Sequence, residues 1–290
     1  MARPERPDRR FDARSGAPVV VAGDRQDRPN LPAGACPFCP GGLEAPEPYA
    51  VRSFVNRWPP LPDGRAEILL YSPRHDASLW SLGVDGARAV VDLWAERTAA
   101  LGRRDDVAYV LVFENRGAEV GATIPHPHGQ LYAFDDVPPV PARELAADAC
   151  AICAEDTRDR LVARAGDWWA AVSNAARYPY ELLLAPDAHV PDLPGLVGES
   201  RDALAAVLVD ALARLDGLFD APLPYMLWVH QRPTDGRDWP GAHVHVEVAP
   251  LLRARDTPRF VAAGELGSGV WFNPVVPEEA AAQLRAVVPR

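Results

Sequence analysis

The stretch YVLVFENRG at residues 109–117 decides how this chain is organised, because YMLWVHQRP at residues 225–233 repeats its pattern 116 positions later. Each is an apolar run of strand length that ends in polar residues. HPH at residues 126–128 follows the first stretch, and HVH at residues 243–245 follows the second at an offset of 117. The chain is therefore predicted to be an internal duplication.

The cysteines extend the repeat toward the N-terminus of each half. They form two Cys-x-x-Cys pairs, at residues 36–39 and 150–153, and 39 positions separate Cys36 from His75 just as they separate Cys150 from His189. In a reducing compartment such pairs hold metal more often than they form disulfides. The two Cys-x-x-Cys pairs therefore predict a zinc-containing protein. The first residues are charged and include no apolar leader segment, so we expect the protein to be cytoplasmic.

Both halves show the same alternation of strand and helix patterns, which predicts an α+β fold. The boundary is placed after residue 135, giving halves 1–135 and 136–290. Apolar strand patterns and helical spacing of Leu and Val indicate strands at 65–73, 107–114, 168–174 and 180–186, and helices at 79–101 and 201–219.

Two segments are predicted to be irregular. The linker DDVPPVPARE at residues 135–144 contains three prolines, which argue against a regular helix or a central strand. The first 40 residues are rich in Arg, Pro and Gly, and we expect residues 24–40 to form an arm that another surface must order.

Composition limits the class of ligand. The chain has 290 residues, 48% hydrophobic and 24% charged, with a formal net charge of -10. This charge repels polyanions and argues against a nucleic-acid partner, while a small phosphate ligand can still bind local Arg and amide groups. No apolar run is long enough to span a membrane, so a membrane partner is not expected either.

Cys36, Cys39 and His75 supply three zinc ligands, and one of the two histidines in His126-Pro127-His128 can supply the fourth. Histidines spaced by two on a strand lie on the same face. One imidazole can therefore bind metal while its neighbour performs chemistry.

The context of this His pair is FENRGAEVGATIPHPHGQLYAF at residues 113–134. Its glycines, Gly117 and Gly121, allow backbone N–H groups to approach phosphate oxygens closely. With ENRGAEVG followed by PHPHGQ, the chain resembles the galactose-1-phosphate uridylyltransferases, a branch of the histidine-triad superfamily. The resemblance covers nearly the whole chain and implies a duplicated α/β half-barrel, with an antiparallel sheet and packed helices.

The resemblance also implies roles for particular residues. It makes His128 the nucleophile, assisted by Gln130, and His126 the fourth ligand of the first zinc site. Arg25 and Arg28 match arginines that reach the phosphate site of a neighbouring subunit, which implies a homodimer. The remaining substrate contacts fall on Asn56, Asn115 and Thr123 for uridine phosphate, and on Arg259, Phe260 and Glu265 for the sugar.

The implied reaction moves UMP from UDP-glucose to galactose 1-phosphate. A neutral imidazole whose second nitrogen is held by a carbonyl can attack the α-phosphorus, and a second displacement then returns UMP to the acceptor. Gln130 stands where the superfamily's hydrolases carry a third His. An amide donates a hydrogen bond without relaying protons to water, so transfer is favoured over hydrolysis.

The second metal site is predicted with an alternative. The internal repeat selects Cys150, Cys153, His189 and His243, whereas family members that lack the second Cys pair imply Glu144, His230, His243 and His245. We prefer the cysteine set because thiolates are strong zinc ligands. Glu247 replaces Gln130 in the repeat and would repel phosphate, so the second half is not expected to be a second active site.

The predicted activity has one uncertain part, the hexose, and two alternatives. The sugar region departs from the family pattern, with Arg259 in place of a Lys and Gly264 in place of a Tyr, so the hexose is less certain than the nucleotide. A dinucleoside polyphosphate or ADP phosphorylase, which would move AMP, is the competing enzyme. A non-catalytic zinc scaffold that binds nucleotides is the alternative of a different class.

Overall fold

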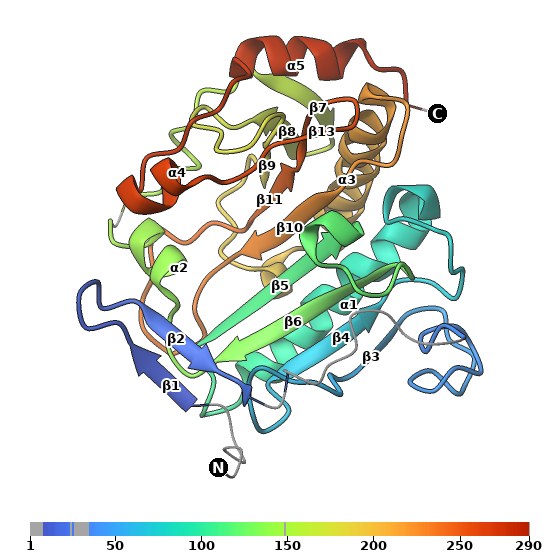
Figure 1. Cartoon of the computed structure of the whole chain (residues 1–290), viewed down its shortest axis with the longest axis vertical. Coiled ribbons are helices and arrows are strands. Elements are labelled where there is room, and N and C mark those ends of the chain that lie inside the picture. Colours follow the sequence, from blue (N-terminus) through green and yellow to red (C-terminus); the bar gives the residue numbers. More distant parts are fainter. Residues whose placement is uncertain (1–7, 24, 26–34, 148, 290) are drawn as a thin grey trace.

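The computed structural model describes residues 8–289 apart from 24, 26–34 and 148, so the predicted contact Arg28 lies outside the described residues. Its central feature is a nine-stranded sheet with the order β3-β4-β6-β5-β10-β11-β9-β8-β7 (Figure 1). Every neighbouring pair in this sheet is antiparallel. The predicted α+β class, with an antiparallel sheet and packed helices, is confirmed.

The sheet is symmetric about its two middle strands, which come from the two repeated stretches of sequence. From the middle outward, the first half contributes β5, β6, β4 and β3, and the second contributes β10, β11, β9 and β8 in the corresponding order. The bounds are β3 (Arg52–Val55), β4 (Ala66–Leu70), β5 (Tyr109–Arg116), β6 (His128–Phe134), β7 (Leu161–Ala165), β8 (Trp168–Val172), β9 (Leu182–Pro186), β10 (Tyr225–His230) and β11 (His245–Pro250).

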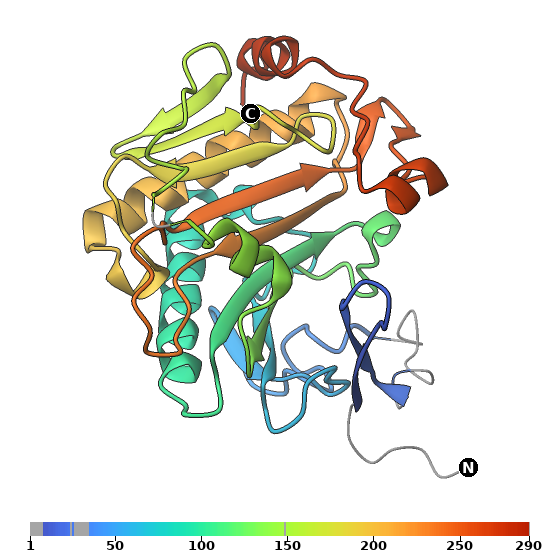
Figure 2. The ribbon, with the colours of Figure 1, turned by 90° about the vertical axis from the view of Figure 1, so that its left-hand side faces the viewer.

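Two long helices, α1 (Gly83–Gly102) and α3 (Gly198–Leu218), cover one face of the sheet and pack against each other (Figure 2). Each repeats apolar residues at helical spacing, and the buried stripe of α1 includes Val90, Leu93 and Trp94. These stripes and the inward side chains of the strands form the main core. The short helix α5 (Pro277–Ala286) adds to this layer at β7 and β8.

Strand alternation separates the core from the site. Gly129 and Leu131 of β6 face the helices: Leu131 is fully buried in the main core, and Gly129 pairs with the core residue Leu69. His128 and Gln130 therefore point to the opposite face, which we call the open face. The sequence places both predicted site side chains there through their spacing of two.

The structure overturns the expectation for the linker and adds a hairpin to the N-terminal region, which was expected to be mostly irregular. The proline-rich linker contains a short helix, α2 (Pro139–Glu144), because its first proline occupies the N-terminal position of the helix, where no backbone N–H is needed. The N-terminal region contains a hairpin of β1 (Asp8–Phe11) and β2 (Pro18–Val21). Arg9 of this hairpin donates a hydrogen bond to Asp135 in the linker, which helps to hold it against the body.

The last segment of the chain lies beyond the repeat. It contains the small pair β12 (Leu252–Ala254) and β13 (Thr257–Pro258), followed by α4 (Ala263–Ser268). Several large apolar side chains are exposed here, including Phe260, Leu266 and Phe272. None of the helices in the described part of the chain is both long and apolar enough to cross a membrane.

One acidic side chain, Glu114 of β5, is buried in the core on the helix face of the sheet. Its Oε1 accepts a hydrogen bond of 2.9 Å from the Tyr225 hydroxyl. Burial raises the pKa of Glu114 to about 7, although the hydrogen bond from Tyr225 and the charge of Arg116 partly oppose this rise.

We predict that Glu114 makes the stability of the protein depend on pH. Its folded pKa is raised, so its contribution is complete below the unfolded pKa and is lost as the pH rises through about 7. Between pH 5.5 and pH 8 the unfolding free energy of the wild type should fall, relative to Glu114→Gln, by roughly 2 kcal/mol. Urea unfolding of both proteins at the two pH values measures this, and parallel pH dependences would contradict it.

Candidate active site and metal centres

The first Cys/His group joins three segments at the edge of the first half. Cys36 and Cys39 come from a turn-rich segment before β3, His75 follows β4, and His126 precedes β6. Cys39 Sγ lies 3.5 Å from His75 Nδ1 and 3.6 Å from His126 Nδ1, and the four ligand atoms are within 4.8 Å of one another. The structure brings together the four residues that the sequence predicts for the first metal site.

These distances fit a zinc ion. Zn–S bonds of about 2.3 Å and Zn–N bonds of about 2.0–2.1 Å in a tetrahedron separate sulfur from nitrogen by about 3.5 Å. His126 Nε2 donates to the Ser72 carbonyl oxygen at 2.7 Å, which leaves Nδ1 as the atom directed at Cys39. Burial lowers the pKa of His126 and so favours the neutral imidazole that a metal requires.

The second Cys/His group repeats this arrangement in the second half. His243 Nδ1 lies 3.3 Å from Cys150 Sγ and 3.4 Å from Cys153 Sγ, and Cys153 Sγ lies 3.3 Å from His189 Nδ1. Burial, and then the neighbouring His189, lower the pKa of His243 to about 4. The preferred cysteine set of the sequence analysis is thus assembled as a zinc-like donor group.

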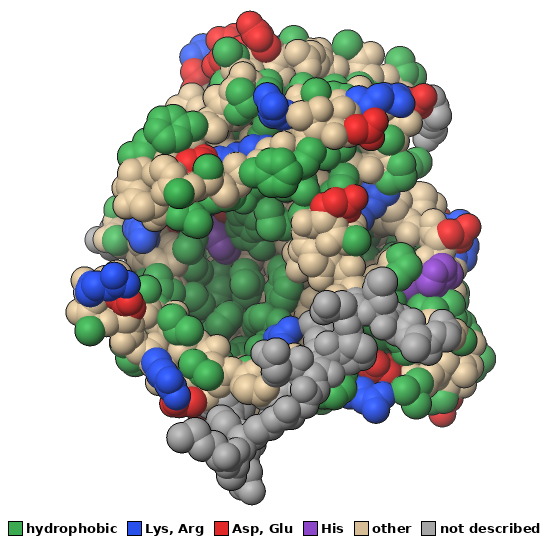
Figure 3. All heavy atoms as spheres, in the orientation of Figure 1, with side chains coloured by type: hydrophobic (Ala, Val, Ile, Leu, Met, Phe, Trp, Pro, Cys, Tyr) green, Lys and Arg blue, Asp and Glu red, His purple; other side chains and the backbone are tan. Residues whose placement is uncertain are grey.

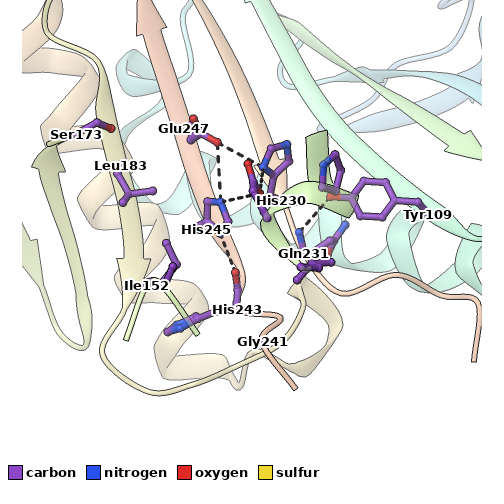
Figure 4. A pocket seen from close by; sticks show the side chains of 14 residues that line it. Tyr109, Ile152, Ser173, Leu183, His230, Gln231, Gly241, His243, His245 and Glu247 are labelled. Atoms are coloured by element: carbon purple, nitrogen blue, oxygen red, sulfur yellow. Dashed lines mark hydrogen bonds and ion pairs between the residues drawn. The ribbon is translucent and has the colours of Figure 1, made fainter. Parts of the chain in front are cut away.

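The alternative set of Glu144, His230, His243 and His245 is not assembled, because His243 faces the sulfur atoms. The other three residues instead meet Glu247, in a group whose ligand atoms also lie within 4.8 Å of one another. His230 Nδ1 lies 2.7 Å from Glu144 and 3.4 Å from Glu247. Figure 4 shows His230, His245 and Glu247 converging in one pocket while the ring of His243 turns away.

His128 is held in one orientation by its own strand. Its Nδ1 lies 2.7 Å from the carbonyl oxygen of His126, and a carbonyl can only accept, so Nδ1 carries the proton and Nε2 the lone pair. The ring of Phe38, between the two cysteines of the first pair, packs edge-on against the imidazole with centroids 5.1 Å apart. The Cys-x-x-Cys turn therefore contacts the predicted nucleophile directly.

The glycine-rich loop adjoins His128, as its sequence predicts. Gly117 and Gly121 have φ values of 101° and 87°, which side-chain-bearing residues rarely adopt. A Cβ atom at Gly117 would also lie 2.9 Å from Pro224 Cβ. A pocket behind the loop is lined by Asn115, the loop backbone and His128. The arrangement offers an imidazole, an amide side chain and a glycine-containing backbone turn to one small ligand.

The loop is anchored by Arg116, whose two guanidinium NH groups donate to the Asp216 carboxylate at 2.6 and 2.8 Å. A bidentate ion pair of this kind fixes direction as well as distance. Asp216 belongs to α3, so a helix of the second half positions the loop of the first half.

Other predicted site residues are more scattered. Asn56 is buried just after β3, and its side-chain oxygen accepts from the Trp58 amide at 2.8 Å. Thr123 lies within the loop, and Arg25 sits half-buried after the N-terminal hairpin. These placements leave their predicted contacts with uridine phosphate as predictions.

Arg259, Phe260 and Glu265 are not brought to His128 within one chain. Arg259 forms a buried ion pair with Glu265, and its guanidinium stacks over Tyr178 and Trp271. Phe260 is 78% exposed. Arg259 and Phe260 precede α4, Glu265 lies within it, and Figure 1 shows this helix away from β6.

The space-filling view shows a hollow over the middle of the sheet on the open face, with a largely hydrophobic lining and a histidine on its wall (Figure 3). The pocket beside His230 and His245 measures about 260 Å³, and its lining includes Pro141, Ile152 and Leu183. A second, larger cavity of about 540 Å³ adjoins the glycine-rich loop and His75. The described residues of each half thus include a cavity of ligand size, and the one in the second half lies beside His230 and His245.

Sequence reasoning missed two residues of the site and underused a third. Phe38 could have been suspected from its place between two ligands, whereas nothing in the sequence pointed to Tyr49, whose hydroxyl lies 2.8 Å from His126 Nε2. Glu247 was interpreted only as a repeat of Gln130. Its spacing of two from His245 was the signal that both face the same pocket.

Comparison with known proteins agrees with this geometry. Residues 59–138 match the N-terminal domain of galactose-1-phosphate uridyl transferase, and residues 142–289 match its C-terminal domain. The galactose-1-phosphate uridylyltransferase of Thermotoga maritima is 36% identical over 92% of this chain and 94% of that protein. A solved uridylyltransferase structure superposes with a TM-score of 0.87 and 28% identity, covering 96% of this chain and 97% of the other.

A more distant relative is the ADP-glucose phosphorylase of Arabidopsis thaliana, 24% identical over 95% of this chain and 88% of that protein. Fold, site and relatives together place the chain among the nucleotidyltransferases. Within that class, it belongs to the galactose-1-phosphate uridylyltransferase family.

We predict that the two Cys/His groups lose zinc independently. Cys36→Ser should remove one zinc ion per chain and Cys150→Ser a different one, because the groups share no residue. Each change should also lower the melting temperature, since a structural metal contributes folding free energy. Elemental analysis of dialysed protein and thermal unfolding measure both effects.

Glu144→Gln is the matched control, since Glu144 belongs to neither Cys/His group. Both zinc ions should remain in this variant. Unchanged zinc content in Cys150→Ser, together with loss of an ion in Glu144→Gln, would instead assign the second metal to the carboxylate-containing group. A third ion that disappears only in Glu144→Gln would show that this group binds metal as well.

Proposed function

We propose that the protein transfers UMP from UDP-glucose to galactose 1-phosphate through a uridylyl-His128 intermediate. His128 Nε2 attacks the α-phosphorus, a P–N bond forms, the bond from the α-phosphorus to the bridging oxygen breaks, and glucose 1-phosphate leaves. A phosphate oxygen of galactose 1-phosphate then attacks the same phosphorus. The P–N bond breaks, UDP-galactose is released, and the reaction is ping-pong.

The observation that carries this proposal is the contact between His128 Nδ1 and the His126 carbonyl oxygen at 2.7 Å. It keeps the proton on Nδ1, so the lone pair of Nε2 is available for attack without any proton transfer. The same carbonyl stabilises the positive charge that develops on the imidazole when the P–N bond forms. A neutral nucleophile also approaches a diphosphate without charge repulsion.

Gln130 supports transfer rather than hydrolysis. It follows His128 by two positions on β6 and so extends to the same face. Its amide can donate to a non-bridging oxygen of the transferred phosphoryl group but cannot relay protons to water. In the second half Glu247 occupies this position and contacts Arg177 and His230, which makes a second transfer site there unfavourable.

Zinc is the metal that both Cys/His groups fit best by donor type and distance. Bound to Cys36, Cys39, His75 and His126, it would cross-link three segments and supply no reacting group. The chain's own residues then do the chemistry. His126 presents its carbonyl to His128, and Phe38 packs against the imidazole from the cysteine turn.

The choice of UMP over AMP follows from the family to which the chain belongs. Asn56, Asn115 and Thr123 are the proposed contacts with the uridine phosphate, and Arg259, Phe260 and Glu265 with the sugar phosphate. Adenylyl transfer, the activity of an ADP phosphorylase, remains the competing proposal. UDP-glucose and ADP-glucose, each offered alone, distinguish the two by the mass that the protein gains.

We further propose that the active form is a homodimer. The predicted sugar contacts lie beside α4, away from His128 in one chain, and the same segment exposes Phe260, Leu266 and Phe272. The hairpin that precedes Arg25 exposes Phe11. A second copy that covers these apolar side chains would also bring the sugar contacts and arginines of one chain to the His128 of the other.

A change of His128 tests the central step. His128→Gly should abolish the gain of one UMP that the wild type shows with UDP-glucose alone, because the attacking nitrogen is gone. Exchange between UDP-glucose and labelled glucose 1-phosphate should fall at least about 10³-fold, a typical loss when a covalent nucleophile is removed. Intact mass spectrometry and exchange kinetics measure the two effects.

Zinc content should be normal in His128→Gly, which separates loss of chemistry from loss of fold. Gln130→His is the comparison variant: it should still gain UMP but release it to water faster, because an imidazole relays protons. Wild-type exchange in His128→Gly would place the nucleophile elsewhere and reject the proposal.

The dimer proposal is tested with Phe260→Asp and Phe272→Asp in one chain. Burying two carboxylates in an apolar contact is unfavourable, so the double variant should become a monomer by light scattering and lose sugar-phosphate-dependent turnover. Glu199→Asp, on the exposed start of α3, is a control that should stay dimeric. A fully active monomeric wild type would contradict the assignment.

A further inference from the structure

A cluster of polar side chains is buried in the core beneath the strand that carries His128 and Gln130. Glu114 of β5 lies on the helix face of the sheet with Tyr71, which follows β4, and Tyr225 of β10. Trp94 of α1 completes the cluster, and its ring meets that of Tyr71 edge-on at 6.1 Å. All four side chains are at most 4% exposed, and none of them enters the transfer chemistry described above.

The cluster touches the catalytic strand at one point, Gly129. This residue separates His128 from Gln130 and faces the helices. A Cβ atom built on Gly129 would lie 2.1 Å from the Tyr71 hydroxyl oxygen and 3.1 Å from the Phe113 carbonyl oxygen. The Tyr71 hydroxyl thus occupies the place that a side chain would take, and it supports the backbone between the two functional residues from below.

The Tyr71 hydroxyl and one carboxyl oxygen of Glu114, Oε2, are buried atoms of neighbouring groups that interact electrostatically, and neither atom has a hydrogen-bond partner in the described part of the structure. The other carboxyl oxygen accepts from the Tyr225 hydroxyl at 2.9 Å. A carboxylic acid suits this place better than a carboxylate, because it can accept from one tyrosine and donate to the other.

Burial favours the neutral form of Glu114 at moderate pH, and the charged and titratable groups around it only partly oppose this effect. Tyr71 and Tyr225 face it from β4 and β10, and burial raises the pKa of both phenols well above its usual range. Arg116, on the same strand, is the nearby cation, but its guanidinium is engaged by Asp216 of α3. Burial therefore outweighs the attraction of Arg116, and the carboxyl pKa is raised.

We propose that Glu114 is a positioning residue for UMP transfer: together with its neighbour Tyr71 it supports Gly129 from below and so fixes the spacing of His128 and Gln130 on the open face. Ionisation of Glu114 would draw both tyrosine hydroxyls toward the carboxylate and shift the support under Gly129. The inference rests on the proposed role of His128.

The test measures the rate at which His128 acquires UMP from UDP-glucose, by rapid quench, from pH 6 to pH 8.5. Glu114→Gln replaces the acid with a neutral group of the same shape. It should label within twofold of the wild type at pH 6 and should lack the alkaline decline, centred near pH 7, that the wild type shows. Tyr71→Phe should label about tenfold more slowly at all pH values, with the KM for UDP-glucose within twofold of the wild type.

Tyr180→Phe is the matched control, because this buried tyrosine bonds to Gln283 far from β6. It should keep the labelling rate and the pH profile of the wild type. The Gln variant also keeps the test independent of folding defects, since Glu114→Ala would leave a cavity.

Two results would overturn the inference while the proposed function stands. One is a wild type that acquires UMP with no alkaline decline; the other is a Glu114→Gln variant that keeps this decline or labels slowly at pH 6. A wild type that acquires no UMP at all would instead reject the proposed function. The variants are compared only if the wild type acquires UMP, so failure of this inference is distinguishable from failure of the proposed function.

Discussion

The backbone pairing of β5 with β10 is the contact on which the rest of this structure depends. Five residue pairs, from Tyr225 opposite Arg116 to Val229 opposite Val112, join two repeats into one continuous sheet. Each repeat alone would leave this strand as an unpaired edge, with backbone groups open to other chains. Pairing the two edges removes that liability and aligns α1 with α3 across a single core. It also sets β6 and β11, each of which begins at the second histidine of a His-x-His motif, on either side of the same axis.

Once the two halves are joined, small differences between them make their open faces suitable for different ligands. Both present a Cys/His group and a second histidine on the open face. The first half adds a glycine-rich loop and an amide at position 130, which suit a phosphoryl group. The second adds Glu247, and with Glu144 from α2 two carboxylates face His230 and His245. A dianionic phosphate is repelled by that pocket, whereas a cation is attracted. The two halves of the duplicated scaffold thus differ in the charge of their pockets and in the glycine-rich loop, which the first half carries.

The sequence was sufficient to predict those strands, helices and metal-like groups that follow from the spacing of residues along the chain. Strand and helix patterns predicted β4, β5, β8, β9, α1 and α3 to within a few residues, and the offsets near 116 predicted the symmetric sheet. The spacing of cysteines and histidines predicted two of the three metal-like groups. The membership of the third group and the helix in the linker depend on tertiary geometry. Nothing local tells which face of the chain His243 turns to, so the cysteine and carboxylate sets looked like alternatives. The linker helix was missed because prolines were counted rather than placed within the first helical turn, where they are compatible with the backbone.

His126 has a consequence beyond either of its separate contacts. Its side chain belongs to the first Cys/His group, while its backbone carbonyl holds the proton of the next histidine in the strand. His126 therefore belongs to the predicted metal site through its side chain and orients the imidazole of His128 through its backbone. We expect the two to fail together: a chain whose cysteine turn has not closed also lacks a reactive imidazole of defined tautomer. We expect newly made or damaged molecules with an open cysteine turn to leave sugar nucleotides unchanged, and not to hydrolyse them.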